Sequence, residues 1–106
     1  MTQYNKLVRD NVPGTLRASG HKVATRTLQG AELLKALRAK VGEEVAEYDA
    51  APDDQRAAEE LADLLEVVMA IAKRRGFTEA AIQQMREAKT AQRGAFDRAL
   101  FLISAE

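Results

Sequence analysis

Apolar residues recur every three or four positions through two long stretches of the chain, and this spacing predicts two long amphipathic helices. The first helix is expected over residues 31–50, with apolar positions at Leu34, Leu37, Val41, Val45 and Tyr48. After the interruption "APDDQ", where a proline and two aspartates favour a new helix start, a wider stripe follows. Its positions are Leu61, Leu64, Leu65, Val68, Ile71 and Ala72, and the basic run "KRRG" then predicts the end of the helix.

A segment with turn-forming residues precedes these two helices. Pro13 and Gly14 mark a turn or a helix start, and Gly20 marks a stop. The segment "HKVATRTL" that follows alternates weakly between residue types. This alternation predicts a short edge strand.

A third helix is expected after the pair. Thr78 is its predicted N-cap, the helix runs to about Gln92, and Gly94 ends it. Ile82 and Met85 are expected to face inward. The tail "RALFLISA" is apolar enough for a short strand or a packing arm.

These elements predict a single, mostly α domain over residues 1–106, with short peripheral extended segments. A tight acidic turn joins the two long helices, so they should be antiparallel neighbours with the third helix packed on them. Three helices cannot easily cover two long apolar stripes, so we expect a second subunit to complete an antiparallel helical bundle. The expected assembly is at least a homodimer.

Composition narrows the function classes. Sixteen Lys and Arg residues balance sixteen Asp and Glu residues, which argues against a nucleic-acid binder that works through bulk charge. The chain has no cysteine, so neither disulfides nor thiolate metal sites are available. The opening "MTQYNKLVRD" lacks the apolar core of a signal peptide, and no apolar run is long enough for a membrane span. We therefore expect a cytoplasmic protein with no membrane or nucleic-acid partner.

Acidic residues interrupt the two long apolar stripes. Glu44 falls on the same stripe as Leu37, where the core should lie, and Glu47 sits one turn further on. Glu60 and Asp63 fall at the flank of the stripe on the following helix. Both pairs lie at similar distances from the turn near residue 52, so the four carboxylates should meet at one level of the bundle.

Four carboxylates in a partly desolvated groove must take up protons or share a cation. Oxygen ligands without His or Cys favour a hard divalent ion, Mg²⁺ first and Mn²⁺ second, and Mg²⁺ commonly shares its shell with substrate phosphates. The competing reading of each pair alone is an ordinary solvated helix face. The matched placement of the two pairs favours the metal site.

The acidic segments "EEVAE" and "EELADLLE" resemble the signature of the all-α nucleoside triphosphate pyrophosphohydrolases, the MazG-like and phosphoribosyl-ATP pyrophosphohydrolase-like superfamily. The opening "YNKLVRD" is similar to the start of a short, single-domain branch of that group, and "KTAQRGAFDRALFL" resembles its closing segment. The sequence departs from the pattern at Asn11, Gly14 and Ala95. The resemblance implies an all-α fold, dimers or dimers of dimers, and active sites near subunit boundaries.

The resemblance also implies roles for individual residues. The basic positions near both ends, which would hold the triphosphate, are Lys6, Arg9, Lys89 and Arg93. Glu43 would bind a second metal or orient the attacking water, and either Glu43 or Glu47 would accept a proton from that water. The implied Mg²⁺ ligands are Glu44, Glu47, Glu60 and Asp63.

The expected reaction is Mg²⁺-dependent hydrolysis of a nucleoside triphosphate between the α and β phosphates, which gives a monophosphate and pyrophosphate and would clear unwanted nucleotides. One alternative is the phosphoribosyl-ATP pyrophosphohydrolase step of histidine biosynthesis, which would use the same acidic core. Another is a non-catalytic helical module for protein association, which would bind no Mg²⁺. The chain has no Gly-rich phosphate loop, so a Walker-type NTPase is not expected.

Overall fold

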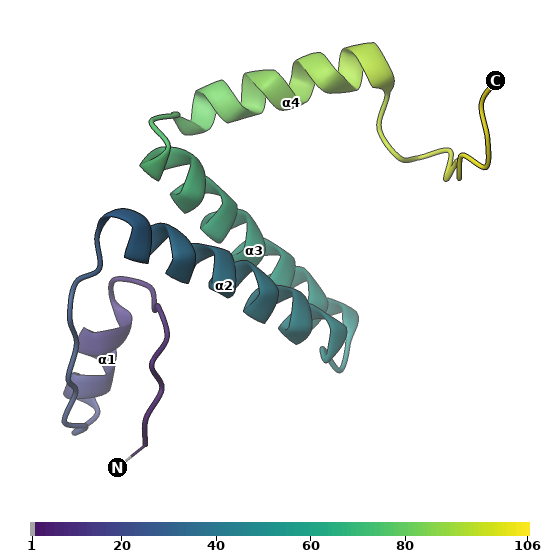
Figure 1. Ribbon diagram of the computed structural model, residues 1–106. Helices are drawn as coiled ribbons and strands as arrows, with labels where there is room; N and C mark the ends of the chain where they lie inside the picture. Colours follow the sequence, from purple (N-terminus) through teal and green to yellow (C-terminus); the bar gives the residue numbers. More distant parts are fainter. Residues whose placement is uncertain (1) are drawn as a thin grey trace.

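The computed structural model describes residues 2–106, and these residues form helices joined by turns and extended segments (Figure 1). No strand occurs within them, so the expected mostly α class is confirmed. None of the helices in this part of the chain is long and apolar enough to cross a membrane. The helices are α1 (Val12–Ala18), α2 (Gly30–Asp49), α3 (Asp54–Arg74) and α4 (Glu79–Arg93).

Side-chain caps start α3 at Asp53, so that Pro52 lies before the helix and not in its first turn, and start α4 at the predicted Thr78. The Asp53 carboxylate accepts a hydrogen bond from the backbone N–H of Arg56 at 2.8 Å, which satisfies one of the free donors at the start of α3. The Thr78 hydroxyl accepts one from the backbone N–H of Ala81 at 3.0 Å and caps α4 in the same way. The predicted N-cap of the third long helix is therefore confirmed.

Helices α2 and α3 form an antiparallel hairpin joined by residues 50–53, as expected (Figure 1). Leu37 of α2 and Val67 and Ala72 of α3 are the buried apolar side chains of the hairpin. Glu44 and Glu60 are buried in the same helices. The hairpin therefore has a small apolar core, and two carboxylates are buried with it.

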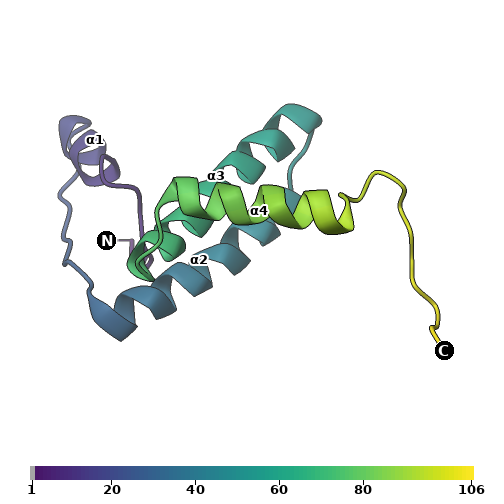
Figure 2. The same ribbon diagram turned by 90° about the horizontal axis from the view of Figure 1, so that it is seen from above.

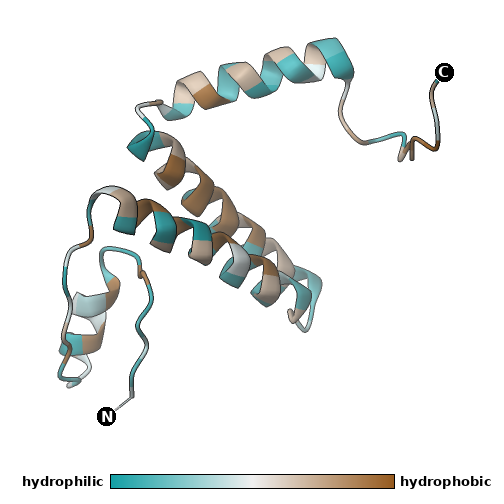
Figure 3. Ribbon diagram, viewed as in Figure 1, coloured by the Kyte–Doolittle hydropathy of each residue, from teal (hydrophilic) through white to brown (hydrophobic). Residues whose placement is uncertain are grey.

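The wide apolar stripe of α3 is divided between two environments. Its inward positions are buried or half-buried, and they are Leu64, Val67 and Ile71. The positions about 100° further round the helix are exposed, and we call them the α3 outer stripe: Leu61, Leu65 and Val68. Figure 3 shows hydrophobic residues along much of α3. One α2–α3 contact thus covers only part of the stripe, and the subunit expected to cover the rest remains a prediction.

Helix α4 does not pack along the hairpin, which corrects the expectation for the third long helix. It contacts α3 alone among the described helices and then runs away from it (Figures 1 and 2). Met85, expected to face inward, is 49% exposed. Gly94 ends α4 at a positive φ of 85°, and residues 95–106, which we call the C-terminal arm, continue without helix or strand. Within one chain, α4 therefore buries little of its apolar face.

The region before the hairpin contains one short helix. Helix α1 begins at Val12, one residue before Pro13, and Gly20 follows its end at a φ of 90°. Residues 21–29 are extended, but they pair with no other strand in the described chain, so the edge-strand prediction is wrong. A lone segment with no sheet to join has no ladder of hydrogen bonds to form.

Candidate metal and substrate site

Three of the predicted carboxylates meet between α2 and α3. Glu44 and Glu47 come from α2 and Glu60 from α3, and one carboxylate oxygen from each lies within 4.8 Å of the other two. The helical spacing explains the meeting, because Glu44 shares a stripe with Leu37, and Glu60 shares one with Val67. We call these three residues the acidic cluster.

Two members of the acidic cluster are removed from water. Glu44 is 5% exposed and Glu60 is 7% exposed, whereas Glu47 is exposed. The Oε2 atoms of Glu44 and Glu60 are buried and have no hydrogen-bond partner among the described residues. Buried carboxylate oxygens of this kind are costly unless a proton or a cation satisfies them. The acidic cluster therefore has free ligand atoms that point into the interior of the hairpin.

Each of these two carboxylates has one ion pair with a cation of its own helix, at a long distance. Lys40 Nζ lies 3.5 Å from Glu44 Oε1. Arg56 Nη2 lies 4.0 Å from Glu60 Oε1, and a second Arg56 nitrogen is paired with Glu59 at 3.4 Å. Both cations stand four residues before their carboxylate on the same helix. Sequence reasoning missed Lys40 and Arg56, although this i, i+4 spacing was visible in the chain.

The pKa of Glu60 is strongly raised. Burial, followed by hydrogen bonding with Glu47 and Glu44 and by the negative charges of Glu47 and Asp63, raises the pKa of Glu60 to about 7. Negative charges this close together disfavour full ionisation, so the arrangement favours a cation among the carboxylates. A raised carboxyl pKa of this kind is typical of functional sites.

Asp63, the fourth predicted metal ligand, is not part of the acidic cluster. Its carboxylate accepts a hydrogen bond from Arg9 Nη2 at 2.7 Å, and its side chain is 40% exposed. It remains close enough for its negative charge to raise the pKa of Glu60. The structure therefore places Asp63 at the edge of the cluster, paired with a residue that the resemblance assigns to substrate binding.

Glu43, which precedes Glu44 on α2, is paired with two lysines. Lys6 Nζ lies 3.2 Å and Lys40 Nζ lies 3.1 Å from Glu43 Oε1. Partial burial alone would raise the pKa of Glu43, but the hydrogen bonds from Lys40 and Lys6 hold it below its ordinary value. The same contact with Glu43 raises the pKa of Lys6. The N-terminal segment therefore brings both of its predicted substrate-binding residues, Lys6 and Arg9, to the acidic face of the hairpin.

The other two predicted substrate-binding residues are not brought there. Lys89 and Arg93 lie on the last two turns of α4, and both are exposed. Helix α4 leaves the hairpin at the end of α3 that is remote from the α2–α3 turn (Figure 1). Within one chain, the basic residues near the two termini therefore do not converge.

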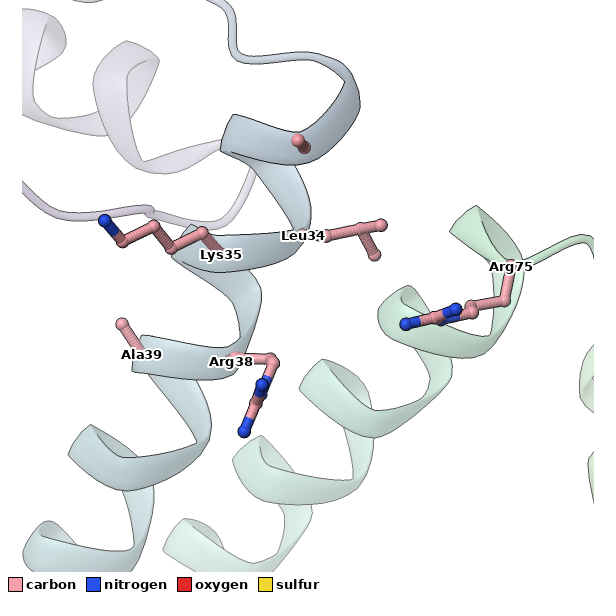
Figure 4. A pocket seen from close by; sticks show the side chains of 6 residues that line it. Leu34, Lys35, Arg38, Ala39 and Arg75 are labelled. Atoms are coloured by element: carbon pink, nitrogen blue, oxygen red, sulfur yellow. The ribbon is translucent and has the colours of Figure 1, made fainter.

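Two grooves lie on the hairpin, at opposite ends. A groove of about 260 Å³ beside the acidic cluster is lined by Glu47, Glu60 and Arg56 together with residues 50–52 of the turn. A larger groove of about 500 Å³ contains none of the predicted site residues and lies where α2 begins and α3 ends. In Figure 4, Leu34 and Arg38 of this larger groove point from α2 toward α3, Arg75 lies at the end of α3, and Lys35 points away. The smaller groove therefore borders two members of the acidic cluster, Glu47 and Glu60.

Comparison with known proteins places the chain beside one relative. A protein of Mycolicibacterium smegmatis (strain ATCC 700084 / mc(2)155), described as an uncharacterized protein, is 52% identical over 46 residues. The match covers 43% of this chain and 47% of the relative, so the chain spans about half of that protein's length. No protein-family model matches the chain, and no solved structure matches it.

Proposed function

We propose that the acidic cluster holds a divalent cation, Mg²⁺ first and Mn²⁺ second, and that the chain is a nucleoside triphosphate pyrophosphohydrolase. The observation that carries the proposal is the pair of buried, unpartnered oxygens on Glu44 and Glu60, two carboxylates that meet between α2 and α3 with Glu47 beside them. Satisfying such atoms requires a proton or a cation. An all-oxygen donor set without His or Cys suits a hard cation.

The groove beside the acidic cluster supports a phosphate substrate. Mg²⁺ is commonly held by one or two carboxylates and keeps waters or substrate phosphates in its remaining positions. Here two of the carboxylates are buried, Glu47 is exposed, and a groove of about 260 Å³ lies beside them. Glu44, Glu47 and Glu60 would hold the metal, and Asp63 would join them once it is released from Arg9. When bound, the metal would neutralise charge on the phosphates and lower the pKa of the attacking water.

Residues of the chain would accept the proton from water and bind the phosphates. Glu47 is exposed to the groove, so it is better placed than Glu43 to accept a proton from water. Glu43 is held by Lys6 and Lys40, so it positions Lys6 at the edge of the site. Arg9 offers a forked donor that suits phosphate oxygens, whereas Lys6 acts as a compact point charge.

The test is release of pyrophosphate from a panel of canonical and modified nucleoside triphosphates and from phosphoribosyl-ATP, with and without Mg²⁺. Glu60→Gln keeps the size of the side chain but removes the ionisable group, so we expect turnover to fall by about 100-fold or more while helicity is unchanged. Glu66→Gln is the matched control, since Glu66 is exposed on the same helix and forms no ion pair within residues 2–106. If the folded parent protein released pyrophosphate from none of these substrates, the proposed activity would be rejected.

A further inference from the structure

A single chain exposes much more surface than a compact protein of its mass. Its accessible surface is 9524 Å², whereas a compact monomer of this mass exposes about 5,800 Å². Its radius of gyration is 17.8 Å, against about 13 Å for a compact chain of this length. Obligate homodimers bury roughly 2,000–5,000 Å² in total, or about half of that on each chain. The surplus of roughly 3,700 Å² on each chain is therefore large enough to supply such an interface.

One part of this surplus is the α3 outer stripe. Leu61, Leu65 and Val68 are 48%, 59% and 38% exposed. They stand at positions i, i+4 and i+7, so they form one continuous apolar strip on α3. No other helix of the described chain covers this strip. Its length along the helix, from Leu61 to Val68, is about 10 Å.

The other part is the C-terminal arm. Its large apolar side chains are 74–97% exposed, and they are Phe96, Leu100, Phe101, Leu102 and Ile103. Successive side chains of an extended segment point to opposite sides, so the consecutive residues 100–103 make both sides of the arm apolar. A run of this kind is typical of segments that are covered on both sides. The extended length of residues 100–103 is also about 10 Å.

Helix α4 holds the arm away from the hairpin of its own chain. The helix has 15 residues, so it carries the start of the arm about 22 Å from the end of α3. Figures 1 and 2 show the arm beyond the far end of α4, well separated from α2 and α3. The apolar strip and residues 100–103 of the arm are thus matched in length, and both are uncovered in a single chain.

We propose that the C-terminal arm of one copy docks on the α3 outer stripe of a second copy, in a reciprocal exchange. A second copy supplies this stripe, because the arm cannot reach the hairpin of its own chain and the surplus surface of each chain is large enough for a dimer interface. A two-fold arrangement uses the same pair of surfaces twice, and both copies lose their exposed apolar residues together. Leu61 follows Glu60 directly, so the docked arm borders the acidic cluster of the partner. The inference depends neither on a metal nor on the proposed reaction.

The absence of cysteine allows a direct test by disulfide cross-linking. The double variant Leu65→Cys/Leu102→Cys should form covalent dimers on mild oxidation, and a mixture of the two single variants should form the corresponding heterodimer. The control pair is Ala31→Cys/Leu102→Cys, whose first site lies on the larger groove at the other end of the hairpin. A disulfide within one chain would overturn the exchange. Equal or faster cross-linking of the control pair, or of Leu102→Cys alone, would overturn the choice of the α3 outer stripe.

Sedimentation of the full chain gives an independent measurement. The parent should be a dimer at micromolar concentration, and Phe101→Asp and Leu65→Asp should each weaken dimerisation by about 100-fold or more, as expected for truncating a buried anchor. Met85→Asp is the control, because Met85 is also exposed but lies on α4 outside both surfaces. Circular dichroism should show unchanged helicity for all three. A monomeric parent at tens of micromolar, or equal dissociation by Met85→Asp, would overturn the proposal.

Discussion

Lowering the pH should weaken Mg²⁺ binding through Glu60. Burial and the neighbouring carboxyl groups raise the pKa of Glu60 to about 7, and a metal ligand must be ionised. The ionised fraction of Glu60 is then about one half at pH 7, about one tenth at pH 6 and about nine tenths at pH 8. Apparent Mg²⁺ affinity should therefore fall about fivefold between pH 7 and 6, and rise about twofold or less between pH 7 and 8.

Isothermal titration calorimetry at pH 6, 7 and 8 and constant ionic strength measures this change. Repeating the titration at pH 7 in two buffers with different protonation enthalpies should show release of about half a proton for each Mg²⁺ bound. Glu60→Gln should bind Mg²⁺ more weakly and lose this part of the pH dependence, whereas Glu66→Gln should keep it. Equal Mg²⁺ affinity of the parent at pH 6 and pH 8 would refute the assignment of Glu60 as a ligand.

Three further predictions concern stability. Mg²⁺ at 100 times its dissociation constant should stabilise the fold by about 2.7 kcal/mol and raise the melting temperature by roughly 10 °C or more, and chelation should reverse the rise. In metal-free buffer the raised pKa of Glu60 makes the folded state bind more protons than the unfolded state. This contribution to stability is therefore full below about pH 4.5 and is lost as the pH rises through about 7. Chemical denaturation should show that the free energy of unfolding of Glu60→Gln rises relative to that of the parent over this interval. Asp53→Ala removes the α3 cap and should cost about 1 kcal/mol, seen as a lower melting temperature by circular dichroism, and an unchanged melting temperature would contradict the role of the cap.

Local features of the fold could be predicted from the sequence because they depend on residues a few positions apart. The caps at Asp53 and Thr78 use side chains that bond to the backbone three residues on, and the stop at Gly94 uses a positive φ. The burial of Glu44 followed from helical periodicity, because Glu44 occupies an inward position of its helix, whereas Glu60 was expected only at the flank of its stripe and is buried as well. These signals were enough to bring the two glutamates together.

Features that depend on distant residues could not be predicted in this way. Asp63 pairs with Arg9, 54 residues away, and no local spacing indicates that contact. The direction of α4 is set by the short turn after α3, so its departure from the hairpin was not visible in its own apolar pattern. Periodicity also gave the full width of the α3 stripe but not its division into an inward half and an exposed half.

Residues 2–9 are held on the hairpin mainly by ion pairs with the acidic face. Lys6 pairs with Glu43 and Arg9 pairs with Asp63, and between them only Leu7 and Val8 are half-buried. A cation that takes up Asp63 must separate it from Arg9, and a phosphate group that binds Lys6 must compete with Glu43. Ligand affinity therefore includes the free energy of loosening residues 2–9. The attachment of this segment to the hairpin and the occupancy of the acidic cluster are thermodynamically linked.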